Sequence, residues 1–345
     1  MVRYFLRRLL ILLPTLIGVT IVVFAIINMA PGGPIEQKLH EMRFGGGETS
    51  SERAASGNRG ASQGVSDEVM EALKKQYGFD KPIHQRYFLW LKNIATLNFG
   101  ESFTYEEPVL DVIVSKFPVS LQFGIISLIL SYLISIPLGI VKAIRNGSMF
   151  DISSSILLFI FYSIPSFMLA ILLIVFLSGG SFLEIFPVGG LYSEMYDEMG
   201  VLEKFLDRVH HFTLPLICYT IGSFTSLTVL MKNSLIEEIK KDYIRTARAK
   251  GLSEKVVYMK HALRNALIPI VTGLGGFLTV FFAGSLLLET IFQLDGIGLL
   301  SYKSILARDY NVIMGLVFIQ SGLFLIGNIL SDIAYVIVDP RIDFT

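Results

Sequence analysis

Six stretches of this chain are apolar and long enough to cross a lipid bilayer. A spanning helix needs about 20 consecutive apolar residues, because each residue advances the helix by only about 1.5 Å. The stretches lie at about 9–29, 119–140, 152–177, 212–231, 267–288 and 312–338. Hydrophobic residues make up 52% of the 345-residue chain and the mean hydropathy is +0.61, which is too apolar for a soluble domain. The sequence therefore predicts an all-α polytopic membrane protein with six transmembrane helices.

These runs divide the chain into four parts. Residues 1–30 are expected to hold a short N-terminal end and the first helix, 31–117 a long, largely helical outer segment, 118–338 the other five helices, and 339–345 the C-terminal end. Residues 43–64 of the outer segment are rich in glycine and serine, which predicts a mobile loop. A helix is expected from Ser66 to Gly78 and another from Pro82. The apolar stripe of the second predicts packing on the membrane surface or on the spanning helices, with substrate binding as the less favoured alternative.

Basic residues are unevenly distributed, although the net charge is zero. If both ends of the chain lie in the cytoplasm, the cytoplasmic segments hold fifteen Lys and Arg, whereas the two short outer loops hold four. The outer segment 31–117 is too long to count, because the positive-inside rule applies only to short loops. The distribution predicts a cytoplasmic N-terminus and a cytoplasmic C-terminus.

The longest polar interruption among the last five runs separates the fourth run from the fifth. From Lys232 to Arg264 it carries nine Lys and Arg against four acidic residues. The spacing predicts two short helices, the first ended by Gly251 in a left-handed conformation and the second capped by Ser253. Small residues at 247, 249 and 251 would leave a surface that another protein can approach closely. We interpret residues 236–265 as a two-helix docking loop, the alternative being an ordinary basic cytoplasmic loop.

Catalytic signatures are absent from the sequence. It contains no Walker A pattern, no H-E-x-x-H, no Cys/His metal spacing and no G-x-S-x-G. His210 and His211 are adjacent, so their side chains would point apart on a helix and are not expected to share a metal. The single cysteine, Cys218, excludes an internal disulfide. We therefore expect no enzyme activity, no metal and no bound cofactor.

Hydroxyl groups on the fourth and fifth runs are candidates for a solute path. Ion-coupled carriers usually place ionisable residues at bilayer depth, whereas Glu289 and Asp332 fall near the ends of runs and are expected to be boundary or packing groups. An ion-coupled transporter or channel and a non-transporting scaffold remain as alternatives. Gly275 and Ala283, with Thr279 between them, form a row of small residues that predicts close helix packing. The candidate path residues are Ser223, Ser226, Thr228, Thr272 and Thr279.

Several short sequence motifs along the chain resemble those of one protein family. T-A-R-A-K-G-L-S at 246–253 and H-A-L-R-N-A-L-I-P at 261–269 resemble the coupling loop of ABC importer permeases of the peptide and nickel subgroup. The general Glu-Ala-Ala of that family is replaced by Arg245, Thr246 and Ala247, so only the second alanine and Gly251 match it directly. With further motifs, the resemblance covers nearly the whole chain. These motifs are Y-G-F-D-K-P, N-F-G-E-S, P-V-L-D-V-I, E-T-I-F-Q-L-D-G-I-G-L-L and V-D-P-R-I-D-F. The A-P-G-G-P at 30–34 and the Gly-rich insert are most similar to the subgroup that imports microcin C-type peptides.

The resemblance implies a permease subunit in the bacterial inner membrane that forms the path for peptides or peptide-like compounds, of microcin C type or oligopeptides. It implies a heterodimer with a second homologous permease, two ABC ATPase subunits that bind ATP and Mg, an extracytoplasmic solute-binding protein and membrane lipid, with no nucleic acid. The coupling residues it implies are Tyr243, Ala247, Arg248, Ala249, Gly251, Leu252, His261, Arg264 and Asn265.

Overall fold

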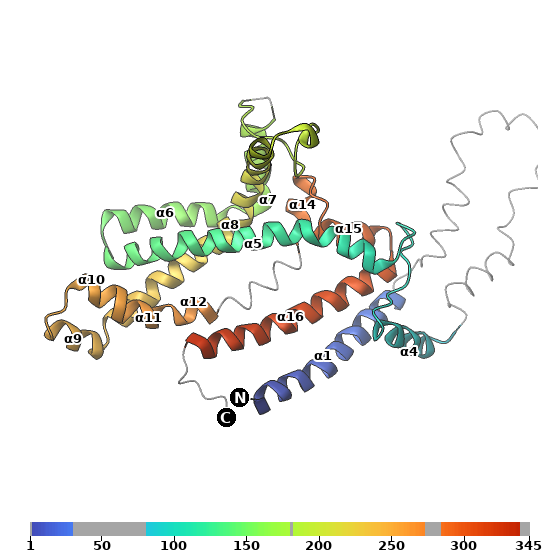
Figure 1. The fold of residues 1–345 in the computed structure, drawn as a ribbon, viewed down its shortest axis with the longest axis horizontal. Helices are drawn as coiled ribbons and strands as arrows, with labels where there is room; N and C mark the ends of the chain where they lie inside the picture. The colour runs from blue at the N-terminus through green and yellow to red at the C-terminus, as the bar shows by residue number, and fades with distance from the viewer. Residues whose placement is uncertain (1, 30–80, 180–181, 273–283, 339–345) are drawn as a thin grey trace, which may run out of the picture. The chain divides into compact units, whose positions relative to one another are not determined.

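The regular structure formed by the described residues is helical. A computed structural model describes residues 2–29, 81–179, 182–272 and 284–338 (Figure 1). These ranges contain helices and one isolated bridge between Glu101 and Pro108, and no strand within them extends it. The predicted all-α fold is confirmed for the described residues. The predicted helix 66–78 and the insert 43–64 lie outside them.

The described helices fall into two compact units. The larger unit contains residues 116–300 together with Met1–Leu12 and Gly322–Thr345. The smaller unit contains Leu13–Ser115 and Ser301–Ser321. Each unit is held together by its own internal contacts.

Three described helices are long and apolar enough to cross a membrane. They are α5 (Val109–Ile144), α8 (Val201–Ile239) and the Tyr310–Ile329 part of α16 (Tyr310–Val338). The first predicted run is also helical, within the 28 residues of α1 (Val2–Met29). The fifth run includes residues 273–283, which lie outside the described ranges, so the count of six spans stays a prediction.

The third predicted run is divided into two helices, α6 (Met149–Ser163) and α7 (Ser166–Leu177), with an angle of 96° between them. Pro165 is the physical reason. It has no backbone N–H to continue a helix, and it disfavours the helical region for the residue before it. Ile164 accordingly has φ −86° and ψ 121°, an extended conformation. Together the two helices contain enough apolar residues for one broken span.

The larger unit is tightly packed where α5 meets α8. A Cβ on Gly139 would lie only 2.6 Å from the Cβ of Met231 and 2.9 Å from the carbonyl oxygen of Thr228. Nearby, the hydroxyl of Ser135 donates to the carbonyl of Phe224 at 3.0 Å. Glycine is therefore required at 139 for the two helices to approach this closely.

A buried carboxylate holds the turn between α14 (Leu286–Ile291) and α15 (Ile297–Leu306). Glu289 is 0% exposed and accepts hydrogen bonds from the Ser120 hydroxyl at 2.8 Å and the Leu299 amide at 2.8 Å. It also accepts from the Ser285 amide at 3.3 Å, so both of its oxygens are engaged. This is the arrangement expected of a packing group.

In the smaller unit, α4 (Ile83–Ile94) packs against α1 through aromatic side chains. The Phe24 ring lies 5.3 Å from the ring of Tyr87 and 6.2 Å from that of Trp90, measured between centroids. The Tyr87 and Thr20 hydroxyls are 3.0 Å apart. The helix predicted from Pro82 is confirmed, with Pro82 itself at the N-cap position.

A second contact in the smaller unit joins the N-F-G-E-S segment to the start of α16. The carboxylate of Asp309 is 0% exposed and accepts hydrogen bonds from the Ser102 hydroxyl and from the Thr104 amide at 3.1 Å. Its other oxygen caps α16 by accepting from the Val312 amide at 3.3 Å. Segments more than 200 residues apart in sequence are thereby fixed to each other.

Candidate functional site

The docking loop begins where α8 ends. Lys240 closes α8, and Lys241 has extended backbone angles (φ −72°, ψ 153°) that turn the chain into α9 (Asp242–Ala249). Asp242 lies in the first turn of α9, where a negative charge is favoured by the helix dipole. Figure 1 shows α9 and α10 (Glu254–Val256) at this end of α8.

The loop has a hydrophobic core of its own that continues into α8. Ile244 is 0% exposed and Ala247 is 6% exposed, so one face of α9 is turned inward. They belong to one buried cluster with Leu235 of α8, whose other loop members are Val257, Ala262 and Ala266. The loop is therefore a folded element whose position is tied to α8.

Gly251 ends α9 as predicted. Its φ is +78°, in the left-handed region where glycine carries no Cβ penalty. The Gly251 amide donates to the Arg248 carbonyl at 2.9 Å, and the Leu252 amide donates to the Ala247 carbonyl at 3.4 Å. This pair of bonds is the Schellman motif, so the chain reverses sharply after α9.

The second half of the loop is helical but not a regular α-helix. Ser253 stands at the predicted N-cap with extended backbone angles, although its side chain makes no capping hydrogen bond. After the single turn of α10 (Glu254–Val256), Val257–Ala262 forms a six-residue π-helix, followed by α11 (Leu263–Ala266) and α12 (Ile268–Thr272). π-helical turns are rare and are frequent at functional sites.

A hydrogen-bonded chain connects α8, α9 and α11. The Tyr243 hydroxyl donates to Glu238, and the Asn265 side chain donates to the Tyr243 oxygen at 3.0 Å. Lys241 forms an ion pair with the same Glu238. Partial burial, together with the hydrogen bond to Glu238, raises the pKa of Tyr243 to about 12, so the phenol stays protonated as a donor. Two of the predicted coupling residues, Tyr243 and Asn265, thus position the loop.

Arg248 bridges the turn at Gly251. Its Nε and Nη2 donate to the two carboxylate oxygens of Glu254 at 2.8 Å and 3.2 Å. Its guanidinium carbon lies 5.8 Å from the centroid of the Tyr258 ring. The hydrogen bonds from Arg248 lower the pKa of the Glu254 carboxyl. This fork geometry needs arginine, because lysine cannot make two parallel bonds.

The outer face of the loop carries an apolar stripe of three residues, Leu252, Val256 and Met259. They are 38%, 37% and 49% exposed; Val256 and Met259 lie three residues apart in the second helical segment, and Leu252 comes just before its N-cap, Ser253. The same loop carries exposed lysines and arginines, namely Arg245, Lys250, Lys255, Lys260 and Arg264. An apolar centre with a charged rim is typical of a protein docking surface.

Ala247 does not contribute to that surface. The sequence predicted that the small residues 247, 249 and 251 together leave an approachable face, but Ala247 is buried against the loop core. Ala249 and Gly251 are exposed. The reason is the rotation of α9, which directs positions 244 and 247 inward and leaves 249 on the outside.

A buried ionic cluster joins α5, α6 and α8 close to the loop. Lys142 is 1% exposed and donates to the Asp151 carbonyl at 2.9 Å and to the hydroxyls of Ser154 at 2.7 Å and Ser155 at 2.8 Å. The Asp151 carboxylate receives Lys142 at 3.1 Å and Lys232 at 2.7 Å. Lys232 therefore forms a buried pair and is not one of the free basic charges of the docking loop.

Residues 135–344 match the model of the family described as binding-protein-dependent transport system inner membrane component. The chain belongs to this family. It is 44% identical to the peptidoglycan transport system permease protein YejB of Agrobacterium fabrum, with 99% of this chain and 98% of that protein covered. It is 43% identical to the inner membrane ABC transporter permease protein YejB of Escherichia coli O157:H7, with the same coverage. It is 34% identical to the oligopeptide transport system permease protein AppB of Bacillus subtilis over the full length of both.

The predicted path residues of this permease are only partly brought together. Ser223 is half-buried and Ser226 is exposed on α8, whereas Thr228 is 0% exposed and donates to the Phe224 carbonyl at 2.8 Å. Thr228 is therefore packed inside the larger unit. Thr272 lies at the end of α12. Thr279, Gly275 and Ala283 lie outside the described residues.

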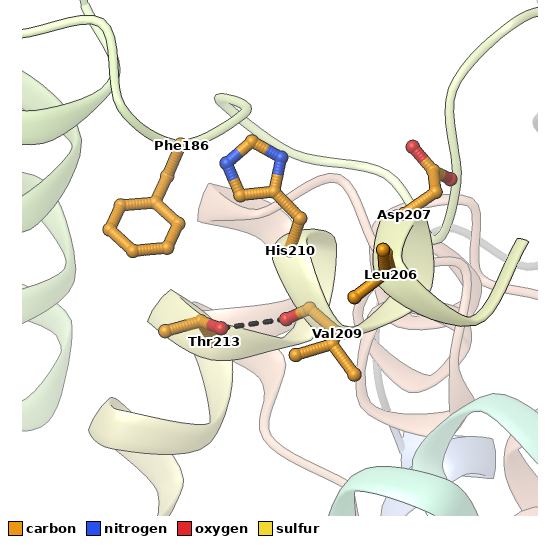
Figure 2. Close-up of a pocket in the computed structure, with 6 residues that line it drawn as sticks. All are labelled: Phe186, Leu206, Asp207, Val209, His210 and Thr213. Carbon is orange, nitrogen blue, oxygen red and sulfur yellow. Dashed lines mark hydrogen bonds between the residues drawn. The ribbon is translucent and has the colours of Figure 1, made fainter. Parts of the chain in front are cut away.

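At the opposite end of α8 the permease has an open cavity of about 410 Å³. Figure 2 shows its lining, with the hydroxyl of Thr213 donating to the Val209 carbonyl at 2.6 Å. The His210 ring forms a hydrogen bond with the Ile185 carbonyl, whereas Nδ1 of His211 lies 3.2 Å from the Gly189 carbonyl oxygen. The two rings therefore contact different parts of the loop before α8. The lining residues are Phe186, Leu206, Asp207, Val209, His210 and Thr213.

Sequence reasoning missed several residues of the candidate site. Met259 and the stripe it completes could have been found, because apolar residues at 252, 256 and 259 are conspicuous in a basic loop. Glu238 and Glu254 were counted only as charges. Of the other predicted coupling residues, His261 is half-buried and Arg264 is exposed.

Proposed function

We propose that this permease forms the membrane path of an ABC importer for peptides or peptide-like compounds. The observation that carries the proposal is the folded loop 242–266, which presents the apolar stripe while its core is continuous with α8. In this proposal two ABC ATPase subunits bind ATP and Mg and hydrolyse the nucleotide, since the sequence has no Walker A pattern of its own. The chain itself binds no cofactor.

The loop suits a groove on an ATPase subunit. A short helix with an apolar stripe commonly docks in a hydrophobic groove of its partner. Movement of the docked loop would be passed to α8, because Leu235, Ile244 and Val257 are fully buried in one cluster. In this proposal the chain has six spans and both ends in the cytoplasm, on the same side as the loop.

The wider assembly is proposed on the family membership. A binding-protein-dependent system needs an extracytoplasmic solute-binding protein, and the path would be completed by a second homologous permease. The relatives are named for peptidoglycan, oligopeptide and dipeptide transport, which supports a cargo with peptide bonds. A microcin C-type peptide is one candidate substrate, and a peptide released from peptidoglycan is another.

A matched pair of substitutions tests the coupling role. Met259→Glu places a charge in the apolar stripe, whereas Met195→Glu makes the same change at another exposed methionine far from the loop in sequence. We expect Met259→Glu to abolish co-purification of the ATPase subunits and uptake of a labelled oligopeptide, with the amount of permease in the membrane unchanged. Met195→Glu should retain the ATPase subunits. Normal ATPase binding by Met259→Glu would refute this docking surface.

A further inference from the structure

Leu97 follows α4 in a backbone conformation that leucine rarely adopts. Its φ is +56°, in the left-handed region. The Leu97 amide donates to the Ile94 carbonyl at 2.8 Å, and the Asn98 amide donates to the Asn93 carbonyl at 3.0 Å. This is the same Schellman pattern that ends α9, where the left-handed position is Gly251. The left-handed position of the Schellman motif is therefore leucine after α4 and glycine after α9.

Packing within the described chain does not offset the strain at Leu97. The side chain is 59% exposed, so it recovers little free energy by burial. Glycine or asparagine would suit the backbone better and would expose less apolar surface to water. Cover by something outside the described chain would offset part of this cost.

The surface around Leu97 is apolar as well. Ile83, Phe88 and Leu89 are 51%, 66% and 44% exposed. Ile83 lies at the N-terminal end of the helix, away from Leu97; the other two, with Leu97, are what we term the α4 surface. They are distinct from the side chains with which α4 packs inside its unit, which are Tyr87, Trp90 and Ile94.

The charge of this segment is of one sign. From Lys81 to Gly100 there are three basic residues and no acidic residue. Lys81 and Lys92 are exposed, and Lys92 follows Phe88 by one helical turn. Basic and apolar side chains on one short amphipathic helix are typical of an element that lies in a membrane interface containing anionic lipid.

The neighbours of α4 agree with this location. The helix is held against α1, whose own side chains at Ile17, Ile21 and Ile26 are 41%, 49% and 63% exposed, as expected of a helix that faces lipid. Tyr87 and Trp90 are the residue types that concentrate at membrane–water boundaries. These contacts all lie within the smaller unit.

We propose that α4 lies in the membrane interface, with Phe88, Leu89 and Leu97 in contact with acyl chains and Lys81 and Lys92 on anionic phospholipid headgroups. The occupant of the α4 surface is thus lipid and not a second protein. The proposal does not depend on the docking of an ATPase subunit, since no residue of the loop 242–266 takes part in it.

Trp90 is the only tryptophan of the chain, so its fluorescence reports on α4. The complete importer is placed in nanodiscs that contain acyl-brominated phosphatidylglycerol or acyl-brominated phosphatidylcholine. The emission of an importer that carries Trp90→Phe is subtracted. We expect brominated lipid to quench the Trp90 signal at least twofold, and phosphatidylglycerol to quench more strongly than phosphatidylcholine at equal mole fraction.

Variants separate the two parts of the proposal. Lys92→Glu should remove the preference for the anionic lipid, whereas Phe88→Ser with Leu97→Gly should reduce quenching by both lipids. Leu97→Gly relieves the backbone, so a misfolded chain does not explain its effect, and Leu202→Ser at an exposed leucine of α8 is the control. Absence of quenching, equal quenching by the two lipids, or loss of quenching when the solute-binding protein is added would overturn the proposal.

Discussion

The ammonium of Lys232 lies 2.7 Å from one oxygen of Asp151 and 2.8 Å from the other, so a single carboxylate joins α8 to the first turn of α6. Lys142 of α5 shares that carboxylate and is more deeply buried than Lys232. Two positive charges on one negative charge leave a net charge of +1, which is costly away from water. The three N–H donors of Lys142 are directed at the Asp151 carbonyl and two serine hydroxyls. The cluster therefore fixes three helices at one point.

Asp151→Asn should destabilise the permease strongly. The substitution leaves the Lys142 and Lys232 charges without a counter-charge, and removing one partner of a buried pair costs roughly 3–5 kcal/mol. We expect a lower melting temperature in detergent, measured by differential scanning fluorimetry. Lys232→Gln is the control, because it leaves the neutral pair of Lys142 and Asp151 in place and should cost less. Equal melting temperatures for Asp151→Asn and the native protein would contradict the role of this cluster.

Glu289→Gln tests whether the buried carboxylate has a packing role or a role in proton transfer. Glutamine keeps one acceptor oxygen and puts an amide in place of the other. That amide would face either the Leu299 amide, or the Ser120 hydroxyl and the Ser285 amide, because these donate to different carboxylate oxygens. An unsatisfied buried group costs about 1–3 kcal/mol, so we expect reduced stability and a reduced amount of protein in the membrane. The uptake rate per folded molecule should keep its pH dependence and persist when the proton gradient is dissipated. Loss of uptake at normal stability would favour the ion-coupled alternative.

Gly251→Ala should weaken the docking loop through its backbone alone. Nothing lies within 4 Å of a Cβ added at this position, so no clash is created, but φ is +78°. A left-handed conformation costs an alanine about 1–2 kcal/mol. We expect faster hydrogen exchange over 242–262, measured by mass spectrometry, and reduced coupling of ATP hydrolysis to uptake. Gly251→Asn, which tolerates this conformation better, should have a milder effect.

Much of the fold could be predicted from the apolar runs and the helix-ending residues. The helix boundaries near Pro82, Gly251 and Ser253 follow from the backbone preferences of these residue types, which can be recognised from the sequence alone. The bend after Ser163 also had a local signal in Pro165, although the run 152–177 was treated as continuous.

The parts that could not be predicted depend on which helix faces meet. The burial of Ala247 depends on the rotation of α9 against the π-helix, and a π-helix has no reliable sequence signature. Lys142, Asp151 and Lys232 are separated by 9 and 81 residues, so no local sequence pattern connects them. For the same reason Thr228 was placed on a path, whereas α5 covers it.

Gly139→Ala should disrupt the contact between α5 and α8. The added methyl group would lie 2.6 Å from Met231 and 2.9 Å from the backbone oxygen of Thr228, which cannot move without shifting the helix. Overpacking of this kind typically costs about 1–3 kcal/mol. Gly222→Ala is the matched control, because no atom lies within 4 Å of its Cβ and alanine favours a helix. We expect the melting temperature to fall for Gly139→Ala and to stay or rise for Gly222→Ala. A fall of equal size in both variants would mean that glycine at 139 serves helix flexibility instead of close packing.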